Sequence, residues 1–188
     1  MRSERRFVRR GFRDRGWFRR RLGFNFHRMS SKFPGFQPAD LPESARVAVI
    51  AARFNTDVVD ELVSGCLGRL EELGIDGSRV DLHRVPGAFE LPVAAKMLAR
   101  TKRYSSIVCL GCIVRGDTPH FDYVAGEAAR GIQEVALTEM IPTIFGVLTT
   151  NTEEQARERV GGKHGHYGER AADAAAEMMA LVLRINRK

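Results

Sequence analysis

Residues 106–122 read SIVCLGCIVRGDTPHFD, and the rest of the chain is best interpreted outward from this stretch. Residues 106–114 are apolar and β-branched, which predicts a buried strand. Glycines, a carboxylate, a hydroxyl and a histidine follow within residues 115–120, which predicts a tight loop at a helix start. The next apolar stripe predicts that this helix runs from His120 to Met140. In an open α/β sheet, such loops lie at the carboxyl ends of strands, where ligands bind.

Two strand–helix units are predicted before this stretch and one strand with two helices after it. The predicted strands are 46–52, 80–85, 106–114 and 143–148, and the predicted helices are 58–73, 89–101, 120–140, 152–159 and 168–185. Asn55 or Thr56 is placed to cap the first helix, and Thr152 to Gln155 form a capping box. Strands that alternate with helices indicate a parallel sheet covered on both faces.

The composition is that of a globular protein with one sizeable core. The chain has 188 residues, 44% of them hydrophobic, and it contains no apolar run as long as a membrane span. Cys66, Cys109 and Cys112 lie in apolar or strand-like surroundings and lack metal-ligand spacing, so we expect three buried thiols. A reduced, cytoplasmic protein follows, with no membrane partner and no metal site.

The positive net charge belongs to the first residues alone. Residues 1–32 carry eleven arginines and one lysine against Glu4 and Asp14, a net charge of +10. Residues 33–188 carry 18 basic and 21 acidic side chains, a net charge of −3. We therefore divide the chain into a basic, disordered arm (1–32), a proline-containing linker (33–44) and one domain (45–188).

The basic arm has four open interpretations. Its arginines are interleaved with aromatic residues, a pattern that can bind nucleic acid by phosphate contact and stacking. It is also Arg-rich and poor in acidic residues, as targeting peptides are. It is also compatible with a solvated tail, or with translation that starts at Met29.

Four predicted strand ends carry unusual side chains. They are Phe54, the Ala88-Phe89-Glu90 segment, the loop from Gly111 to His120, and Phe145. Because the carboxyl ends of parallel strands share one edge, we expect these residues to surround one ligand. Backbone N–H groups at a helix start suit a phosphate. No G-x-G-x-x-G, Walker or Gly-x-Ser-x-Gly pattern is present, so the residues alone predict a small phosphate-bearing ligand and no particular reaction.

Five segments together resemble the lumazine synthase family, in that family's order and spacing. They are A-R-F-N (52–55), V-P-G-A-F-E-L-P (85–92), L-G-C-I-V-R-G-D-T-P-H-F-D-Y-V (110–124), I-P-T-I-F-G-V-L-T-T (141–150) and E-Q-A-R-E-R (154–159). The resemblance covers about residues 46–183. It implies a flavodoxin-like three-layer α/β/α sandwich whose four-stranded parallel sheet has the order 2-1-3-4.

The resemblance also implies a reaction. The family condenses 5-amino-6-ribitylaminouracil with 3,4-dihydroxy-2-butanone 4-phosphate to give 6,7-dimethyl-8-ribityllumazine, phosphate and water, the penultimate step of riboflavin biosynthesis. The amine of one substrate attacks the ketone of the other, so no protein nucleophile, metal or cofactor is expected. Close placement of the two substrates supplies much of the rate.

Carried over from the family, one residue is catalytic and twelve bind substrate. His120 is expected to move protons. Phe54 is expected to stack on the pyrimidine, Glu90 to hold ribityl hydroxyls, and Arg159 to pair with the phosphate. The binding set is Phe54, Ala88, Phe89, Glu90, Cys112, Ile113, Val114, Gly116, Asp117, Thr118, Phe145 and Arg159.

Three positions depart from the family pattern. Tyr167 stands where many members have a substrate-binding lysine, and Lys163 or His166 is a candidate substitute. Asp117 places a carboxylate beside the expected phosphate, so its side chain is expected to point away. Cys112 replaces a common threonine.

The resemblance implies an oligomer in which Phe145 reaches a neighbouring subunit's site. Lumazine synthases form pentamers, and some assemble pentamers into sixty-subunit hollow capsids; the sequence does not distinguish these states. A shell whose cationic arms hold nucleic acid or acidic cargo is the second functional hypothesis, of a different class from the enzyme.

Overall fold

The computed structural model describes residues 41–186. The predicted basic arm and the linker up to residue 40 lie outside the described residues. Among residues 41–186, no helix is long and apolar enough to cross a membrane.

Four parallel strands form the central sheet in the order β2-β1-β3-β4, which confirms the predicted order. Their bounds are Val47–Ala52 (β1), Val80–Val85 (β2), Ser106–Val114 (β3) and Thr143–Thr150 (β4). The two central strands, β1 and β3, are buried almost throughout, as their continuous apolar runs predict. The edge strands β2 and β4 are only partly buried.

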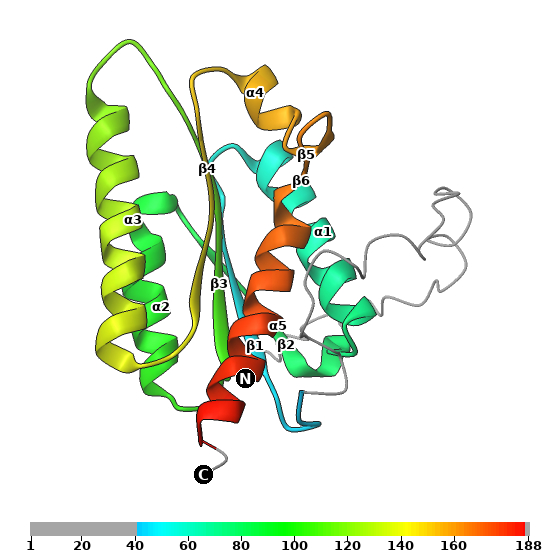
Figure 1. Ribbon diagram of the computed structural model, residues 1–188. Coiled ribbons are helices and arrows are strands. Elements are labelled where there is room, and N and C mark those ends of the chain that lie inside the picture. Colours follow the sequence, from blue (N-terminus) through cyan, green and yellow to red (C-terminus); the bar gives the residue numbers. More distant parts are fainter. Residues whose placement is uncertain (1–40, 187–188) are drawn as a thin grey trace, which may run out of the picture. The chain divides into compact units, whose positions relative to one another are not determined.

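Two pairs of helices cover the two faces of the sheet (Figure 1). The bounds are Thr56–Glu72 (α1) and Tyr167–Asn186 (α5) on one face, and Leu91–Arg100 (α2) and His120–Glu139 (α3) on the other. Side chains alternate between the faces, because successive strand residues point in opposite directions. In β1, Val49 belongs to the core under α1 and α5, whereas Ile50 belongs to the core under α2 and α3. The flavodoxin-like three-layer sandwich is therefore confirmed.

The second helix starts later than predicted. A short 3-10 turn, η5 (Ala88–Glu90), precedes α2, which has Pro92 in its first turn. A second 3-10 turn, η4 (Gly77–Arg79), leads into β2. The loop that contains Ala88 and Glu90 is thus a separate tight turn at the end of β2.

The segment after β4 differs most from its prediction. The helix α4 spans only Glu153–Arg157, and an antiparallel hairpin of β5 (Val160–Gly162) and β6 (Gly165–His166) follows it. Gly161 and Gly165 adopt φ angles of 109° and 78°, which allow the tight return. Strands of three and two residues are too short to show an alternating pattern, so sequence periodicity could not reveal this hairpin.

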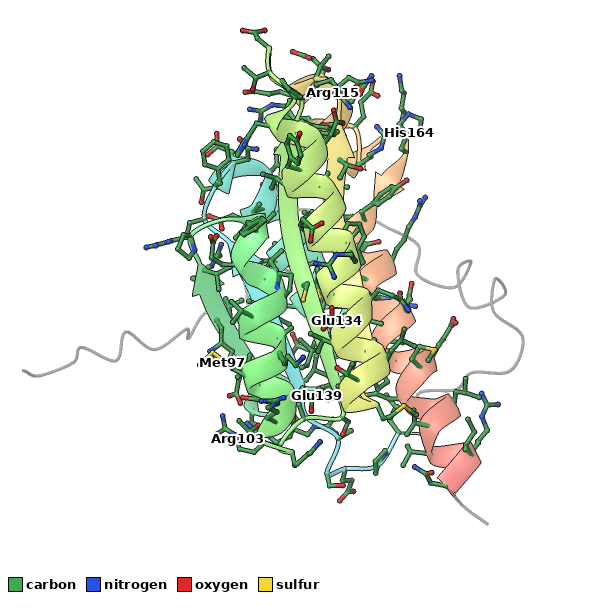
Figure 2. All side chains as sticks on the ribbon, turned by 90° about the vertical axis from the view of Figure 1, so that its left-hand side faces the viewer. Met97, Arg103, Arg115, Glu134, Glu139 and His164 are labelled. Carbon is green, nitrogen blue, oxygen red and sulfur yellow. The ribbon has the colours of Figure 1, made fainter. Side chains whose placement is uncertain are left out.

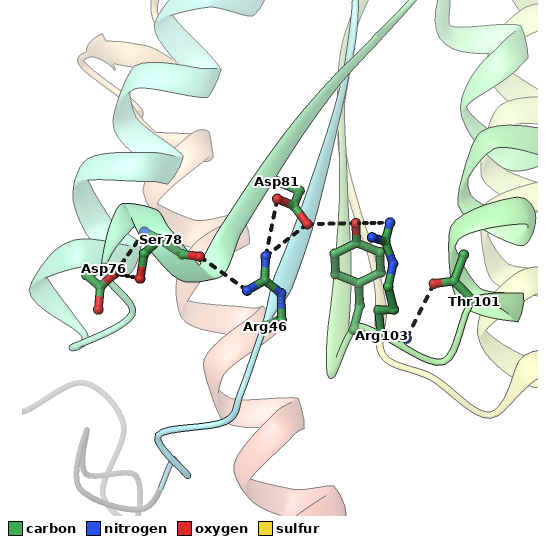
Figure 3. Close-up of polar contacts among 7 residues, drawn as sticks. Arg46, Asp76, Ser78, Asp81, Thr101 and Arg103 are labelled. Atoms are coloured by element: carbon green, nitrogen blue, oxygen red, sulfur yellow. Dashed lines mark hydrogen bonds and ion pairs between the residues drawn. The ribbon is translucent and has the colours of Figure 1, made fainter. Parts of the chain in front are cut away.

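At the amino ends of the strands, a polar network joins β1, β2 and β3 (Figure 3). The Asp81 carboxylate accepts hydrogen bonds from Arg46 Nη2 at 3.1 and 3.3 Å and from the Tyr104 hydroxyl at 2.8 Å. Arg46 Nη1 also donates to the Ser78 carbonyl at 3.2 Å. The hydrogen bonds from Tyr104 and Arg46 hold the pKa of the Asp81 carboxyl below its usual range. This network ties three strands together at the end of the sheet opposite the candidate site.

Candidate active site

The loops that follow β1 and β2 run side by side. Arg53 N donates to the Val85 carbonyl at 2.8 Å, and Phe54 N donates to the Pro86 carbonyl at 3.2 Å. These bonds continue the β1–β2 pairing beyond the strands, so Phe54 lies next to the turn that carries Phe89. Both rings are largely exposed, 71% for Phe54 and 58% for Phe89. Two aromatic faces are therefore free to stack on a planar ligand at this edge.

The carboxylate of Glu90 is held in place by its own turn. Glu90 Oε2 accepts the backbone N–H of Gly87 at 2.9 Å, which leaves Oε1 as a second acceptor on the same carboxylate. Ala88, in the same turn, is buried against Gly111 of β3. The turn after β2 is thus fixed to β3 and presents a charged acceptor beside the exposed rings.

The end of β3 forms the buried wall of the region. Cys112 and Ile113 are buried and Val114 is half-buried. Burial, reinforced by nearby Glu153, raises the pKa of the Cys112 thiol to about 11, so this thiol stays protonated and is a poor nucleophile. Cys66 and Cys109 are also buried, which confirms the expectation of three buried thiols.

Asn55 has a role that sequence reasoning missed. It occupies the N-cap position of α1 but makes no side-chain capping bond, contrary to one of the two predicted caps. Instead, its Nδ2 donates to the Cys112 carbonyl at 2.9 Å, with the backbone in the left-handed region (φ 56°, ψ 48°). Asparagine tolerates this conformation better than most residues, which is the sequence signal that could have suggested it. The bond fixes the Phe54 loop to the end of β3.

The loop after β3 is exposed and leads directly into α3. Gly116, Asp117, Thr118 and the helix-starting His120 are all exposed. This loop and the connection between β4 and α4 lie at the same end of the molecule (Figure 1). The start of a 20-residue helix carries a partial positive charge and free N–H groups, which favour an anion.

Arg159 lies at the same end, after α4. Its Nη1 donates to the Gln155 carbonyl at 2.7 Å, and its own carbonyl accepts the N–H of Tyr167 at 2.8 Å. The side chain is half-buried, and its guanidinium has further donors beyond the one bound to Gln155.

The two candidate substitutes for the family's lysine are engaged elsewhere. Lys163 Nζ lies 2.7 Å from Glu158 Oε1. His166 Nδ1 accepts the Gly168 N–H at 3.2 Å, and its ring lies against Gly65 of α1. Tyr167 instead lies under the guanidinium of Arg170, whose carbon is 4.6 Å from the ring centroid.

Phe145 does not join the other residues in this chain, and its expected place at a strand end is wrong. It is the third residue of β4 and pairs with Cys109, whereas the strand end at Thr150 pairs with Val114. Phe145 lies five positions before that end, a distance of about 17 Å along the strand. The sequence prediction ended β4 at Leu148 and could not reveal this register. Phe145 remains 42% exposed on an edge strand.

The assembled region can bind a planar ring, polyhydroxyl groups and an anion side by side. Exposed aromatic rings, a fixed carboxylate and a helix start supply these three functions. Within residues 41–186, no three His, Cys, Asp or Glu side chains gather as a metal site.

Comparisons with known proteins point to one family. A family model described as 6,7-dimethyl-8-ribityllumazine synthase matches residues 44–182. Two proteins named 6,7-dimethyl-8-ribityllumazine synthase, from Coxiella burnetii strains CbuG_Q212 and RSA 493 / Nine Mile phase I, are each 45% identical to this chain over 142 residues. The aligned region covers 76% of this chain and 94% of each relative.

Proposed function

Because the chain belongs to the 6,7-dimethyl-8-ribityllumazine synthase family, and is thus a transferase of riboflavin biosynthesis, we propose that it joins 5-amino-6-ribitylaminouracil to 3,4-dihydroxy-2-butanone 4-phosphate. The products are 6,7-dimethyl-8-ribityllumazine, phosphate and water. The observation that carries this proposal is the cluster of exposed Phe54, fixed Glu90 and the His120 helix start around one edge of the sheet.

Placement of two substrates is the main task of such a site. An amine of the pyrimidine attacks the ketone carbon and a first water leaves to give an imine. Phosphate is then eliminated, and attack of the ribityl-bearing nitrogen on the remaining carbonyl closes the ring with loss of a second water. Each step is intrinsically accessible once the two molecules are held together in the right orientation. Phe54 and Phe89 would stack on the pyrimidine, while Glu90 Oε1 accepts hydrogen bonds from the ribityl hydroxyls. The end of β3, with buried Cys112 and Ile113 and half-buried Val114, would form the floor under the heterocycle.

The phosphate would bind at the start of α3. The N–H groups of Gly116, Asp117 and Thr118 and the helix dipole support an anion there. Arg159 supplies a cation whose remaining donors can form a fork to phosphate oxygens. The exposed position of Asp117 is consistent with a side chain that points away from the anion.

His120 would transfer the protons. It is exposed at the first residue of α3, next to the expected phosphate, and an imidazole can both accept and donate a proton. A neutral imidazole can accept a proton from the attacking amine and return it to a leaving oxygen.

The active unit would be a cytoplasmic homo-oligomer in which a second copy completes each site. Phe145 is exposed on the edge strand β4 and is too far along that strand to serve its own chain's cluster. Exposed Phe89 in η5 and exposed Val93 and Met97 on α2 recur every four residues and form one apolar stripe, which favours contact with another copy. A ring of five copies is the assembly we propose. The three unpaired buried cysteines fit a reducing compartment.

The proposal is tested by a two-substrate assay on the full chain and on residues 29–188. We expect formation of the lumazine chromophore and release of phosphate in equal amounts, well above the reaction without enzyme. A folded oligomer that binds the lumazine but forms none would contradict the proposal and point to Tyr167 and Asp117 as the cause.

The charge of residues 1–32 supports a second role, the binding of nucleic acid or acidic cargo. Salt-sensitive binding of single-stranded RNA by the full chain, absent from residues 29–188, is the expected result. Equal binding by both forms would rule this role out for the arm.

A further inference from the structure

Arg115 is tied to the sheet at its backbone and to α3 at its side chain. It follows β3 directly, and its N–H donates to the Thr150 carbonyl at the end of β4 at 2.9 Å. Its guanidinium forms a fork to the Asp122 carboxylate, with Nη2–Oδ1 at 2.8 Å and Nη1–Oδ2 at 3.3 Å. Asp122 is in the first turn of α3. The exposed loop 116–119 and His120 therefore lie between the two paired residues in the chain.

The third nitrogen and one face of the guanidinium also make contacts. Nε donates to Asn151 Oδ1 at 3.2 Å, and the central carbon lies 4.1 Å from the centroid of the Phe121 ring. Figure 2 shows Arg115 above α3, at the end of the molecule that carries the loop. An isolated pair this exposed, with side chains 42% and 59% accessible, contributes little stability. Here the planar guanidinium also stacks on the Phe121 ring and is held by Asn151, so its orientation is fixed. A fixed guanidinium can in turn fix the orientation of the loop that binds the ligand.

A second branch of the same network reaches Arg159. The N–H of Asn151 donates to Gln155 Oε1 at 2.9 Å, and the Gln155 carbonyl accepts Arg159 Nη1 at 2.7 Å. Thr152 Oγ1 accepts the Gln155 N–H at 3.3 Å and so fixes the start of α4. Arg115 is therefore connected through hydrogen bonds to both groups expected at the phosphate, the α3 start and Arg159.

We propose that Arg115 is a positioning residue, which holds the loop 116–119 and His120 in the geometry that binds the phosphate-bearing substrate. This inference rests on the proposed function of that loop. Arg115 acts through Asp122, Phe121 and Asn151, because these partners bind each of its three side-chain nitrogens and one face of its guanidinium. Lysine, with a single point charge, cannot reproduce the fork and the stacking together.

Two variants, Asp122→Asn and Arg115→Lys, test the proposal against a matched control. Glu127→Gln removes a carboxylate from the same exposed helix, where it pairs with Arg130 away from the loop. The first measurement is amide hydrogen exchange of residues 115–123 in the full chain without substrate. We expect about tenfold faster exchange in Asp122→Asn and Arg115→Lys, and wild-type exchange in Glu127→Gln.

The second measurement is steady-state kinetics with each substrate varied in turn. We expect KM for 3,4-dihydroxy-2-butanone 4-phosphate to rise about tenfold in both variants while KM for the pyrimidine changes less than about twofold. A purely structural role would instead lower the amount of active enzyme and leave both KM values unchanged.

The two measurements separate this inference from the proposed function. Unchanged exchange in both variants overturns the inference even if the wild type is fully active. An equal rise of both KM values also overturns it. If the wild type has no activity but exchange accelerates only in the loop variants, the positioning role of Arg115 stands and the proposed reaction fails.

Discussion

In the proposed reaction, His120 is the residue that transfers protons. It is exposed at the first position of α3, so its replacement leaves no buried cavity. We expect His120→Ala to lower kcat about a hundredfold, the lower end of general acid–base effects, because substrate placement continues to lower the barrier.

The matched control for His120 is His164, an exposed histidine in the turn of the β5–β6 hairpin (Figure 2). His164→Ala should retain wild-type kcat and KM. The check is steady-state kinetics with the chromophore assay, together with circular dichroism to show that both variants are folded. Wild-type kcat in His120→Ala would exclude histidine as the proton donor and acceptor.

At the scale of the elements, α5 approaches the backbone of α1 closely at Gly168. A Cβ built on Gly168 would lie 2.1 Å from the Leu62 carbonyl oxygen and 3.1 Å from the Cys66 nitrogen, both backbone atoms of α1. Backbone atoms in a helix cannot move aside easily, so Gly168→Ala must push the two helices apart. We expect it to lower the free energy of unfolding by about 1–3 kcal/mol.

Gly68, in the same helix α1, provides the control for Gly168. A Cβ on Gly68 would meet nothing within 4 Å, so Gly68→Ala should gain helix propensity and raise the free energy of unfolding by about 0.5–1 kcal/mol. Urea unfolding of both variants at one protein concentration is the measurement. The opposite order of stability would contradict the close packing of α1 and α5.

The main helices and strands were largely predictable, and their exceptions have identifiable causes. Continuous apolar runs predicted β1 and β3 because strands buried on both faces must be apolar on both faces. The predicted capping box is half correct: Thr152 accepts from Gln155 N, but the Gln155 side chain accepts from Asn151 N instead of Thr152 N. Which backbone N–H a side chain binds depends on the direction of that side chain, and the residue type alone does not determine this direction.

Across the sheet, the Asp81 network predicts a pH dependence of stability. The pKa of Asp81 in the folded chain lies below its ordinary value of 3.8, so the unfolded chain binds the proton more readily. The ionised Asp81 carboxylate therefore contributes to the free energy of unfolding above about pH 4. This contribution is lost as the pH falls through the pKa that Asp81 has in the folded chain. We expect Asp81→Asn to lower the free energy of unfolding by about 1 kcal/mol at pH 7 and to have little effect near pH 2.

The control for Asp81 is Glu61→Gln, which alters an exposed carboxylate on α1. Its effect on the free energy of unfolding at pH 7 should be within about 0.5 kcal/mol. Urea unfolding between pH 2 and pH 7 gives the comparison. If Asp81→Asn lowers the free energy of unfolding by the same amount at pH 2 and at pH 7, the charge of Asp81 does not contribute to stability.

If each site is shared between two copies, as proposed, two inactive variants should restore each other's activity. His120→Ala and Phe145→Ala should each be nearly inactive alone, because every site then lacks one group. In a ring with head-to-tail contacts, co-expression in equal amounts should regenerate about a quarter of the wild-type sites by random mixing. The measurement is the specific activity of the purified mixed oligomer. Activity no higher than the mean of the two single variants would place both residues in one chain's site or exclude Phe145 from it.

The order of apolar runs and of apolar stripes at helical spacing was sufficient to predict a parallel sheet with helices on both faces. Burial of a strand on both faces requires a continuous apolar run, and burial of one helix face requires an apolar residue every three or four positions. The same sequence indicated the loop 116–118, His120 and Glu90, because glycines and polar residues directly after strands lie at one edge. The place of Phe145, the bond from Asn55 to Cys112 and the fork from Arg115 to Asp122 emerged only from the folded chain. Strand register and side-chain partners depend on residues distant in sequence, and no local pattern encodes those distances.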